Sequence, residues 1–395
     1  MNVLRWYVWN FAFVGLLGFA LSSQACPFCE GSNDKTLVNQ FGDAQIVLFG
    51  HFENPKLGKG ELDQGISDFV IERVYKEHDM VKGKKTIPVN RFITDSKTKF
   101  LVFCDIYKGK IDAYKGTQLV DDSEMVRYVE GLMKIKEKSQ PERLRFAFDF
   151  LNSQETEVAM DAYREFARAD YRDYKDMAKT LPADKIAAWL KDPKTSSSRY
   201  GLYASLLGHC GNSEHAKLLM SMITDPEKRK SSGLHGLMAS YAMLEPEKGW
   251  AFLKDLVQEK QQPFLVRYSG LQTIRFLYES RPDVVANDET AAKKEIVSGI
   301  LGVLNVADMA DFAIEDLRKW KRWETCDRVL SLFGQKGYNT PIIRKSILRY
   351  ALQCPTDAAK RFVKEQQARD SDWVNDTREL LELETIPSTS PPTTK

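Results

Sequence analysis

Residues 192–223, DPKTSSSRYGLYASLLGHCGNSEHAKLLMSMI, are predicted to form two short helices joined by a turn. Asp192-Pro193 opens this segment, the first helix is predicted to start at Arg199, and the stretch from Gly208 to Gly211 is predicted to stop it. The buried faces are predicted from apolar residues three or four positions apart, namely Leu202, Leu206, Leu207, Ala216, Leu219 and Met222. Because each helix has only one apolar stripe, the pair must bury it against neighbouring pairs.

The helical period continues from about residue 125 almost to the end of the chain, in a series of short amphipathic segments separated by loops with Pro or Gly. A second, looser copy of the pair spans Trp323 to Leu352. This pattern resembles HEAT-like helical repeats over residues 139–383. The resemblance implies a right-handed α-solenoid of stacked helix pairs, which we place at residues 125–383. The Pro- and Thr-rich residues 384–395 are predicted to form a disordered tail.

The chain before residue 125 has the pattern of strands. Alternating or short continuous apolar runs are separated by clusters of Gly, Asn, Asp and Pro, and they occupy residues 44–52, 66–75, 84–93, 99–107 and 110–116. The last two runs predict a hairpin that turns at Lys108-Gly109-Lys110. Five short strands in a row favour a small β-barrel, which we place at residues 26–124.

The first residues predict export from the cytoplasm. Residues 1–25 carry one cation, Arg5, then an apolar run, and then Ser23-Gln24-Ala25, which has the small residues of a signal-peptidase site. The run is shorter than the roughly 20 residues of a membrane-spanning helix. We therefore expect a signal peptide that is cleaved after Ala25, and a mature protein that is secreted, periplasmic or at the cell surface. An uncleaved anchor and a lipid-modified Cys26 are the alternatives.

The mature N-terminus also carries a resemblance. Cys26, a second cysteine close behind it, then DAQIVLFGHF, FVIERVYKEHDMVKGKKTIPV, FLVF and a Gly-Lys hairpin resemble the netrin-like, OB-type barrel of tissue inhibitors of metalloproteinases. In that family the N-terminal cysteine is held by disulfides, and its α-amine and carbonyl chelate the zinc of the protease. This chain has CxxC where the inhibitors have CxC, and Cys104 lies within the FLVF strand, so the disulfide map of the family does not transfer cleanly.

Cys26 and Cys29, in CPFC, have several interpretations. A redox pair needs a preceding strand and a helix N-terminus, and a zinc site needs two further ligands. We favour a structural staple in which Cys26 or Cys29 is bonded to Cys104, while a Cys26–Cys29 bond and a lipid anchor stay open. The other three cysteines, Cys210, Cys326 and Cys354, are expected to be free thiols buried on helices.

Motifs that would identify an enzyme are absent from the sequence. It contains no G-x-S-x-G, P-loop, G-x-G-x-x-G or H-E-x-x-H pattern, so we predict a protein that is not an enzyme and needs no cofactor. Two interpretations fit Asp161, Arg164, Glu165 and Arg168: a binding surface, or a solvated helix face with i,i+4 charge pairs. His209, Cys210 and His215 lie in one turn and are candidate metal ligands, although three such residues in a loop are usually bystanders.

The charge balance limits the class of partner. The chain of 395 residues has 57 Lys and Arg against 55 Asp and Glu, with no basic stripe, so nucleic-acid binding is not predicted. Beyond the signal peptide or a lipid anchor, nothing in the sequence predicts a membrane contact. We expect a binding or scaffold protein that holds a protein partner on its solenoid. The alternative is an exported enzyme inhibitor or thiol-redox protein that acts through the barrel and CxxC.

Overall fold

The computed structural model describes residues 35–58, 65–120 and 122–385. The predicted signal peptide, Cys26, Cys29 and all but the first two residues of the predicted tail lie outside these ranges. The described residues form two compact units, the N-terminal unit up to Lys293 and the C-terminal unit from Lys294, and the division falls within α12 (Glu289–Val303).

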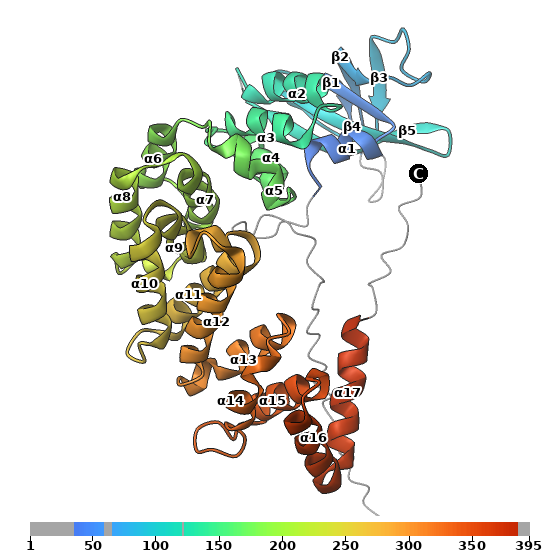
Figure 1. Ribbon diagram of the computed structural model, residues 1–395. Helices are drawn as coiled ribbons and strands as arrows, with labels where there is room; N and C mark the ends of the chain where they lie inside the picture. The colour runs from blue at the N-terminus through green and yellow to red at the C-terminus, as the bar shows by residue number, and fades with distance from the viewer. Residues whose placement is uncertain (1–34, 59–64, 121, 386–395) are drawn as a thin grey trace, which may run out of the picture. The chain divides into compact units, whose positions relative to one another are not determined.

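An antiparallel sheet of five strands occupies the start of the N-terminal unit, in the order β3-β2-β1-β4-β5 (Figure 1). The strands are β1 (Ile46–Lys56), β2 (Ile66–Lys76), β3 (Thr86–Val89), β4 (Lys99–Tyr107) and β5 (Lys110–Leu119). Helices α2 to α17 follow the sheet. The predicted layout of a β part followed by an α part is therefore confirmed.

The turn between β4 and β5 shows why the hairpin could be predicted. Lys108 and Gly109 both have positive φ, 49° and 73°, and Tyr107 pairs directly with Lys110. Two successive residues with positive φ form the type I′ turn, whose twist matches that of the two strands. Glycine adopts such a conformation at little cost, so the Lys-Gly dipeptide specifies the turn.

The sheet buries apolar side chains on both faces. One face holds a cluster that includes Ile46, Leu48, Phe69, Val102 and Cys104. On the other face, Phe103 of β4 packs edge-on against Phe41 of α1 (Leu37–Asp43), with ring centroids 5.4 Å apart. Because both faces are covered, β4 is apolar at successive positions instead of alternating.

Ten helices follow the sheet within the N-terminal unit before α12. They are α2 (Glu124–Ile135), α3 (Gln140–Phe148), α4 (Thr156–Ala167), α5 (Tyr171–Ala178), α6 (Ala183–Lys191), α7 (Tyr200–Cys210), α8 (Ser213–Thr224), α9 (Leu234–Leu244), α10 (Pro246–Gln258) and α11 (Phe264–Ser280). Helices α5, α7, α9 and α11 pack side by side in that order, while α6, α8 and α10 pack against α7, α9 and α11 respectively (Figure 1). The alternation makes two layers of helices.

The helix pair at residues 192–223 forms α7 and α8, and all six residues predicted for its buried faces are buried. The predicted stop at residues 208–211 is confirmed, because α7 ends at Cys210 and Gly211 is its C-cap. A Cβ atom at Gly208 would lie 3.0 Å from Cα of Ser240 in α9, so this glycine lets two helices approach closely.

The C-terminal unit continues with α13 (Ala310–Lys319), α14 (Cys326–Leu330), α15 (Pro341–Gln353), α16 (Asp357–Arg369) and α17 (Ser371–Thr385). Helices α13, α15 and α17 pack in sequence, and α14 packs on α16. Arg318, only 4% exposed, donates to Glu315 and to Glu384, and Arg349 also pairs with Glu384. These ion pairs fix the last turn of α17, so residues 384 and 385 are helical and do not belong to the predicted tail.

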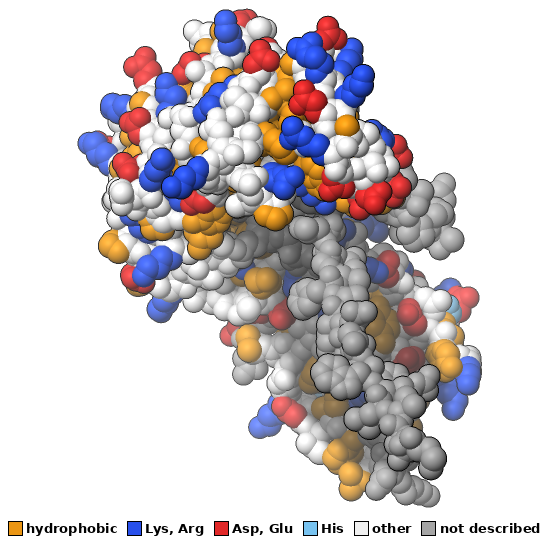
Figure 2. Space-filling model, turned by 90° about the horizontal axis from the view of Figure 1, so that it is seen from below, with side chains coloured by type: hydrophobic (Ala, Val, Ile, Leu, Met, Phe, Trp, Pro, Cys, Tyr) orange, Lys and Arg blue, Asp and Glu red, His pale blue; other side chains and the backbone are white. Residues whose placement is uncertain are grey.

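None of the helices in the described ranges combines the length and the apolar composition that crossing a membrane requires. On the face drawn in Figure 2, basic and acidic side chains are interspersed.

Candidate functional site

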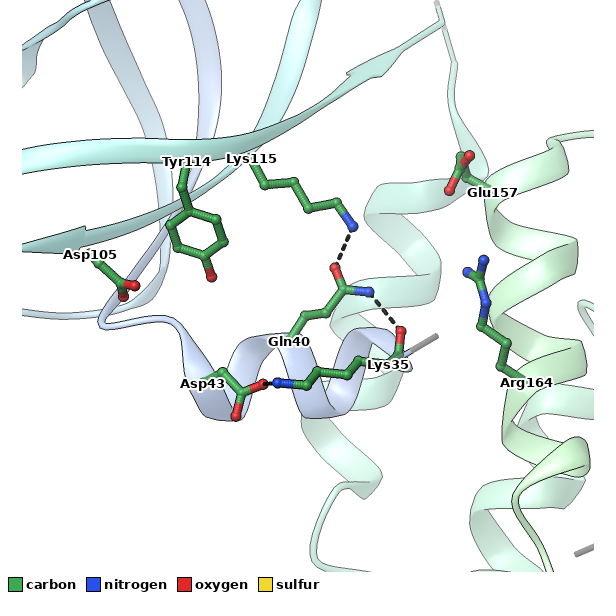
Figure 3. A pocket seen from close by; sticks show the side chains of 8 residues that line it. All are labelled: Lys35, Gln40, Asp43, Asp105, Tyr114, Lys115, Glu157 and Arg164. Carbon is green, nitrogen blue, oxygen red and sulfur yellow. Dashed lines mark hydrogen bonds and ion pairs between the residues drawn. The ribbon is translucent and has the colours of Figure 1, made fainter. Parts of the chain in front are cut away.

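A polar groove of about 580 Å³ lies between α1, the β4–β5 hairpin and α4 (Figure 3). It is lined by Lys35, Gln40, Asp43, Asp105, Tyr114, Lys115, Glu157 and Arg164. Tyr114 points from β5 toward α1, and Arg164 and Glu157 lie on the side formed by α4 (Figure 3). The groove therefore joins the β part of the chain to its first helices.

Side chains of α1 and of Lys35, two residues before it, are linked to one another along this groove. Lys35 Nζ lies 2.7 Å from the Asp43 carboxylate, and the Gln40 amide donates to the Lys35 carbonyl at 2.8 Å. Lys115 Nζ reaches across from β5 to donate to Gln40 Oε1 at 2.6 Å. Burial, and then Asp105 and Asp43, raise the pKa of Tyr114, so this phenol stays neutral.

A buried carboxylate on α4 holds the start of α1. Asp161 is 1% exposed, and its two oxygens accept hydrogen bonds from the Leu37 backbone N–H at 2.7 Å and from the Tyr128 hydroxyl at 2.9 Å. Burial raises the pKa of Asp161 to about 6, although both hydrogen bonds favour the charged form. Asp161 thus anchors the chain a few residues after the CPFC segment.

Glu165, one turn further along α4, supports the same contact. Its side chain is buried and bonds to the Thr36 side chain, and burial raises its pKa. The predicted binding surface contained Asp161, Arg164, Glu165 and Arg168, but the two carboxylates lie beneath residues 36 and 37. Of the four, Arg168 is exposed and Arg164 lines the groove, so a surface made of all four does not exist.

A second site is a cleft of about 590 Å³ at the C-terminal ends of α5, α7, α9 and α11. We call it the helix-end cleft. Its lining residues come from those four helix ends and the turns that follow them: Lys175, Asp176, Lys179, Gly208, His209, Gly211, Asn212, Met243, Leu244, Ser280, Arg281 and Asp283. The side-by-side packing of these four helices brings their last turns together.

A chain of hydrogen bonds crosses the helix-end cleft. Arg281 donates through Nε and Nη2 to both oxygens of Asp283, at 2.9 and 2.8 Å, and through Nη1 to the Tyr171 hydroxyl at 3.4 Å. The Tyr171 hydroxyl lies 3.1 Å from His209 Nε2. These contacts join α5, α7 and the end of α11, which orients the guanidinium and the imidazole rigidly.

The titration of the two ring side chains follows from their burial. Burial raises the pKa of Tyr171 to about 12. Burial, followed by the positive charges of Arg281 and Lys179, lowers the pKa of His209 to about 4. At neutral pH the imidazole is therefore uncharged, and the Tyr171 hydroxyl can donate to it.

The weak metal candidates are not brought together. His209 faces the helix-end cleft, whereas the His215 ring lies 3.2 Å from both the Asn212 N–H and the Asp184 carboxylate. Cys210 donates back to the Leu206 carbonyl, and burial raises the pKa of its thiol to about 11. Within the described ranges no group of three metal-binding side chains converges.

Cys104, the predicted partner of the staple, lies on β4 within the sheet core and is fully buried. Burial raises the pKa of its thiol to about 12, and the thiol is free in the structure. Because Cys26 and Cys29 are outside the described residues, the staple stays a prediction.

Of the residues that line the helix-end cleft, the sequence singled out His209 as a possible metal ligand and Gly208 and Gly211 as a helix stop, but it did not connect them with Tyr171 or Arg281. Tyr171 and Arg281 are 110 positions apart, and neither belongs to a recognisable motif. A further local signal is the pair Lys175 and Lys179, which lie one turn apart at the end of a short helix.

Comparison with known proteins does not assign this chain to a family. No protein-family model matches this chain, and no match is found among curated proteins or among solved structures.

Proposed function

We propose that this chain is an exported, non-catalytic binding protein that holds a segment of a protein partner in the helix-end cleft. The observation that carries the proposal is the hydrogen-bonded chain Asp283–Arg281–Tyr171–His209. It supplies fixed polar groups of both signs in a cleft whose volume is within the usual range for a binding site.

The titration of these groups favours binding over acid–base chemistry. A general acid or base works best when its pKa is near the working pH. The pKa values of His209, about 4, and Tyr171, about 12, are far from neutrality on either side. Asp161 has a pKa of about 6, but its carboxylate is buried and bonded to the Leu37 N–H and the Tyr128 hydroxyl.

The polarity of the cleft fits an extended polar peptide better than a compact apolar ligand. Lys179 pairs with Asp176 and Arg281 with Asp283, so donors and acceptors alternate along the lining. The last carbonyl groups of a helix have no partner within that helix. The carbonyl groups at the four helix ends can therefore accept hydrogen bonds, and Lys179 and Arg281 can donate them. A peptide backbone has both N–H donors and C=O acceptors, so it can pair with both.

Two finer features of the fold belong to this proposal. The alternation of α5, α7, α9 and α11 with α6, α8 and α10 supports an α-solenoid, in which a long surface is built from equivalent helices. In the sheet, Cα atoms of the edge strands β3 and β5 come within 8 Å of each other. This approach, together with the strand order, supports an OB-like barrel that closes between these two strands.

A matched pair of charge reversals tests the cleft. Lys179 in the cleft and Lys217 on α8 each form an i,i+3 ion pair, with Asp176 and Glu214, and their side chains are 63% and 72% exposed. Partners are first identified by capture on the wild-type protein from the exported fraction. We expect Lys179→Glu to weaken the affinity of the purified partner at least about tenfold, or 1.4 kcal/mol. Lys217→Glu should leave that affinity unchanged; an equal effect of the two variants would rule out the cleft.

A second candidate function uses the mature N-terminus. The segment that carries Cys26 and Cys29 leads directly into Thr36 and Leu37, which Glu165 and Asp161 hold in place. That anchoring favours a presented N-terminal segment, as in the inhibitors that the barrel resembles. Deleting residues 26–34 separates the two functions, because it should abolish inhibition or thiol exchange but leave partner binding in the cleft intact.

A further inference from the structure

Two cysteines of the C-terminal unit share one hydroxyl group. Cys326 is the first residue of α14, Cys354 caps the end of α15, and Thr356 caps the start of α16. The Sγ atom of Cys326 lies 3.1 Å from Thr356 Oγ1, and that of Cys354 lies 3.4 Å from the same oxygen. Three helix ends therefore place both thiols around one atom.

The two thiols also interact with each other, and the described part of the C-terminal unit contains no other cysteine. Burial, and then hydrogen bonding with Cys354, raise the pKa of Cys326, while the bond with Thr356 lowers it. Both side chains are buried, at 3% and 4% exposure. In the sequence, these are the only cysteines after residue 293, so within the described part of the C-terminal unit each is the only possible disulfide partner of the other.

We propose that Cys326 and Cys354 are a disulfide site, which a disulfide oxidant such as glutathione disulfide or an oxidised thiol–disulfide oxidoreductase converts to the Cys326–Cys354 bond. This bond replaces the two free thiols that the sequence alone predicts. This disulfide proposal is separate from the proposal of partner binding. Only the formation of the bond in the cell rests on the proposed export, because an exported protein enters an oxidising compartment.

The exchange with glutathione disulfide balances in two steps. A thiolate of one cysteine attacks the glutathione disulfide, which forms a mixed disulfide and releases one glutathione thiolate. The thiolate of the second cysteine then attacks the protein sulfur of the mixed disulfide and releases the second glutathione. The two protons of the protein thiols pass to the two glutathione thiolates, and the two electrons reduce one glutathione disulfide to two glutathione molecules.

The position of the pair gives the bond a structural role. It would join the start of α14 to the end of α15 and enclose the loop between them, where Gly334 and Gly337 have positive φ. A covalent link of this kind restricts the unfolded chain more than the folded one. The buried position also implies that the bond forms while this segment is open, during folding or a local opening.

Peptide mapping of the full chain tests the proposal. The reduced protein is unfolded in denaturant, refolded in equal concentrations of reduced and oxidised glutathione, blocked with iodoacetamide and digested with trypsin without reduction. We expect residues 323–328 and 350–360 to appear as one linked peptide whose mass is about 2 Da below the sum of the separate peptides, because one disulfide replaces two thiols. Both cysteines recovered as separate alkylated peptides, or joined to any other cysteine, would overturn the proposal.

Variants separate this site from other cysteines and from export. Cys326→Ala and Cys354→Ala should each abolish the linked peptide, whereas Cys210→Ala, a change in the N-terminal unit, should preserve it. If either core variant fails to fold, the wild-type map alone still decides. Retention of residues 1–25 in cells would refute cleavage after Ala25 and leave the linkage measured on purified protein unaffected.

Discussion

Two buried titratable side chains act in opposite directions on the stability of the N-terminal unit as the pH changes. The pKa of Asp161 is raised from 3.8 to about 6, so its contribution to stability is fully present below 3.8 and is lost as the pH rises through 6. The pKa of His209 is lowered from 6.5 to about 4, so its contribution is present above 6.5 and is lost as the pH falls through 4. Between pH 4 and 6 the two contributions largely offset each other.

Without the Asp161 carboxylate, the pH dependence of stability should be that of His209 alone. Asp161→Asn keeps an oxygen for the Leu37 N–H but cannot titrate, so the free energy of unfolding should rise by about 3 kcal/mol between pH 4 and 6.5. Urea unfolding at a series of pH values measures this slope. A variant whose pH profile is the same as that of the wild type would show that Asp161 has an ordinary pKa.

Removing the histidine should have the opposite effect. His209→Gln retains an acceptor for the Tyr171 hydroxyl, and the remaining Asp161 contribution should make the protein less stable, again by about 3 kcal/mol, as the pH rises from 4 to 6. The same urea series reports it. If stability instead rises with pH in this variant, the imidazole is not the group responsible for the opposing contribution.

The sequence could identify the charged residues of α4 but not their environment. Asp161, Arg164, Glu165 and Arg168 alternate in sign like a solvated helix face. The two carboxylates are covered by residues 36 and 37. Leu37 is 124 positions away from Asp161 in the sequence. No local pattern contains that contact.

At the scale of elements, glycines decide how closely helices pack. A Cβ atom at Gly236 of α9 would lie 2.7 Å from Cα of Gly201 in α7, so an added methyl group must push two backbones apart. The sequence predicts α7 from its period, but a glycine within an apolar helix does not by itself reveal a close approach to another helix.

Gly236→Ala should therefore destabilise the protein by about 1 to 3 kcal/mol, measured by chemical denaturation. Gly42 of α1 is the matched control, since a Cβ atom there would have no atom within 4 Å. Gly42→Ala should be neutral or stabilising by up to about 1 kcal/mol, through the higher helix propensity of alanine. Equal destabilisation by both changes would argue against the close packing of α7 and α9.

The strands were predictable for a different reason. Their patterns are local, and the Lys108-Gly109 turn fixes the register of β4 with β5. The order of the strands was not predictable, because β1 pairs with both β2 and β4, and only the fold brings β4 beside it.

At the scale of the whole molecule, one packing rule recurs within each unit. Alternate helices pack side by side, as α5, α7, α9 and α11 in the N-terminal unit and as α13, α15 and α17 in the C-terminal unit. Amphipathic periodicity is sufficient to predict that helices stack. It does not reveal that four helix ends meet in a cleft, because Lys175 and Asp283 come from opposite ends of that layer.

The central claim is that the helix-end cleft holds a partner protein, and site-specific photo-crosslinking in the exporting cells tests it most directly. A photoreactive amino acid replaces Lys179 in the cleft in one protein and Lys217 on α8 in the other, since both positions are exposed and carry the same kind of ion pair. The account predicts a defined protein adduct from position 179 that is absent from position 217. Adducts of equal yield and identity from both positions, or none from position 179, would contradict it.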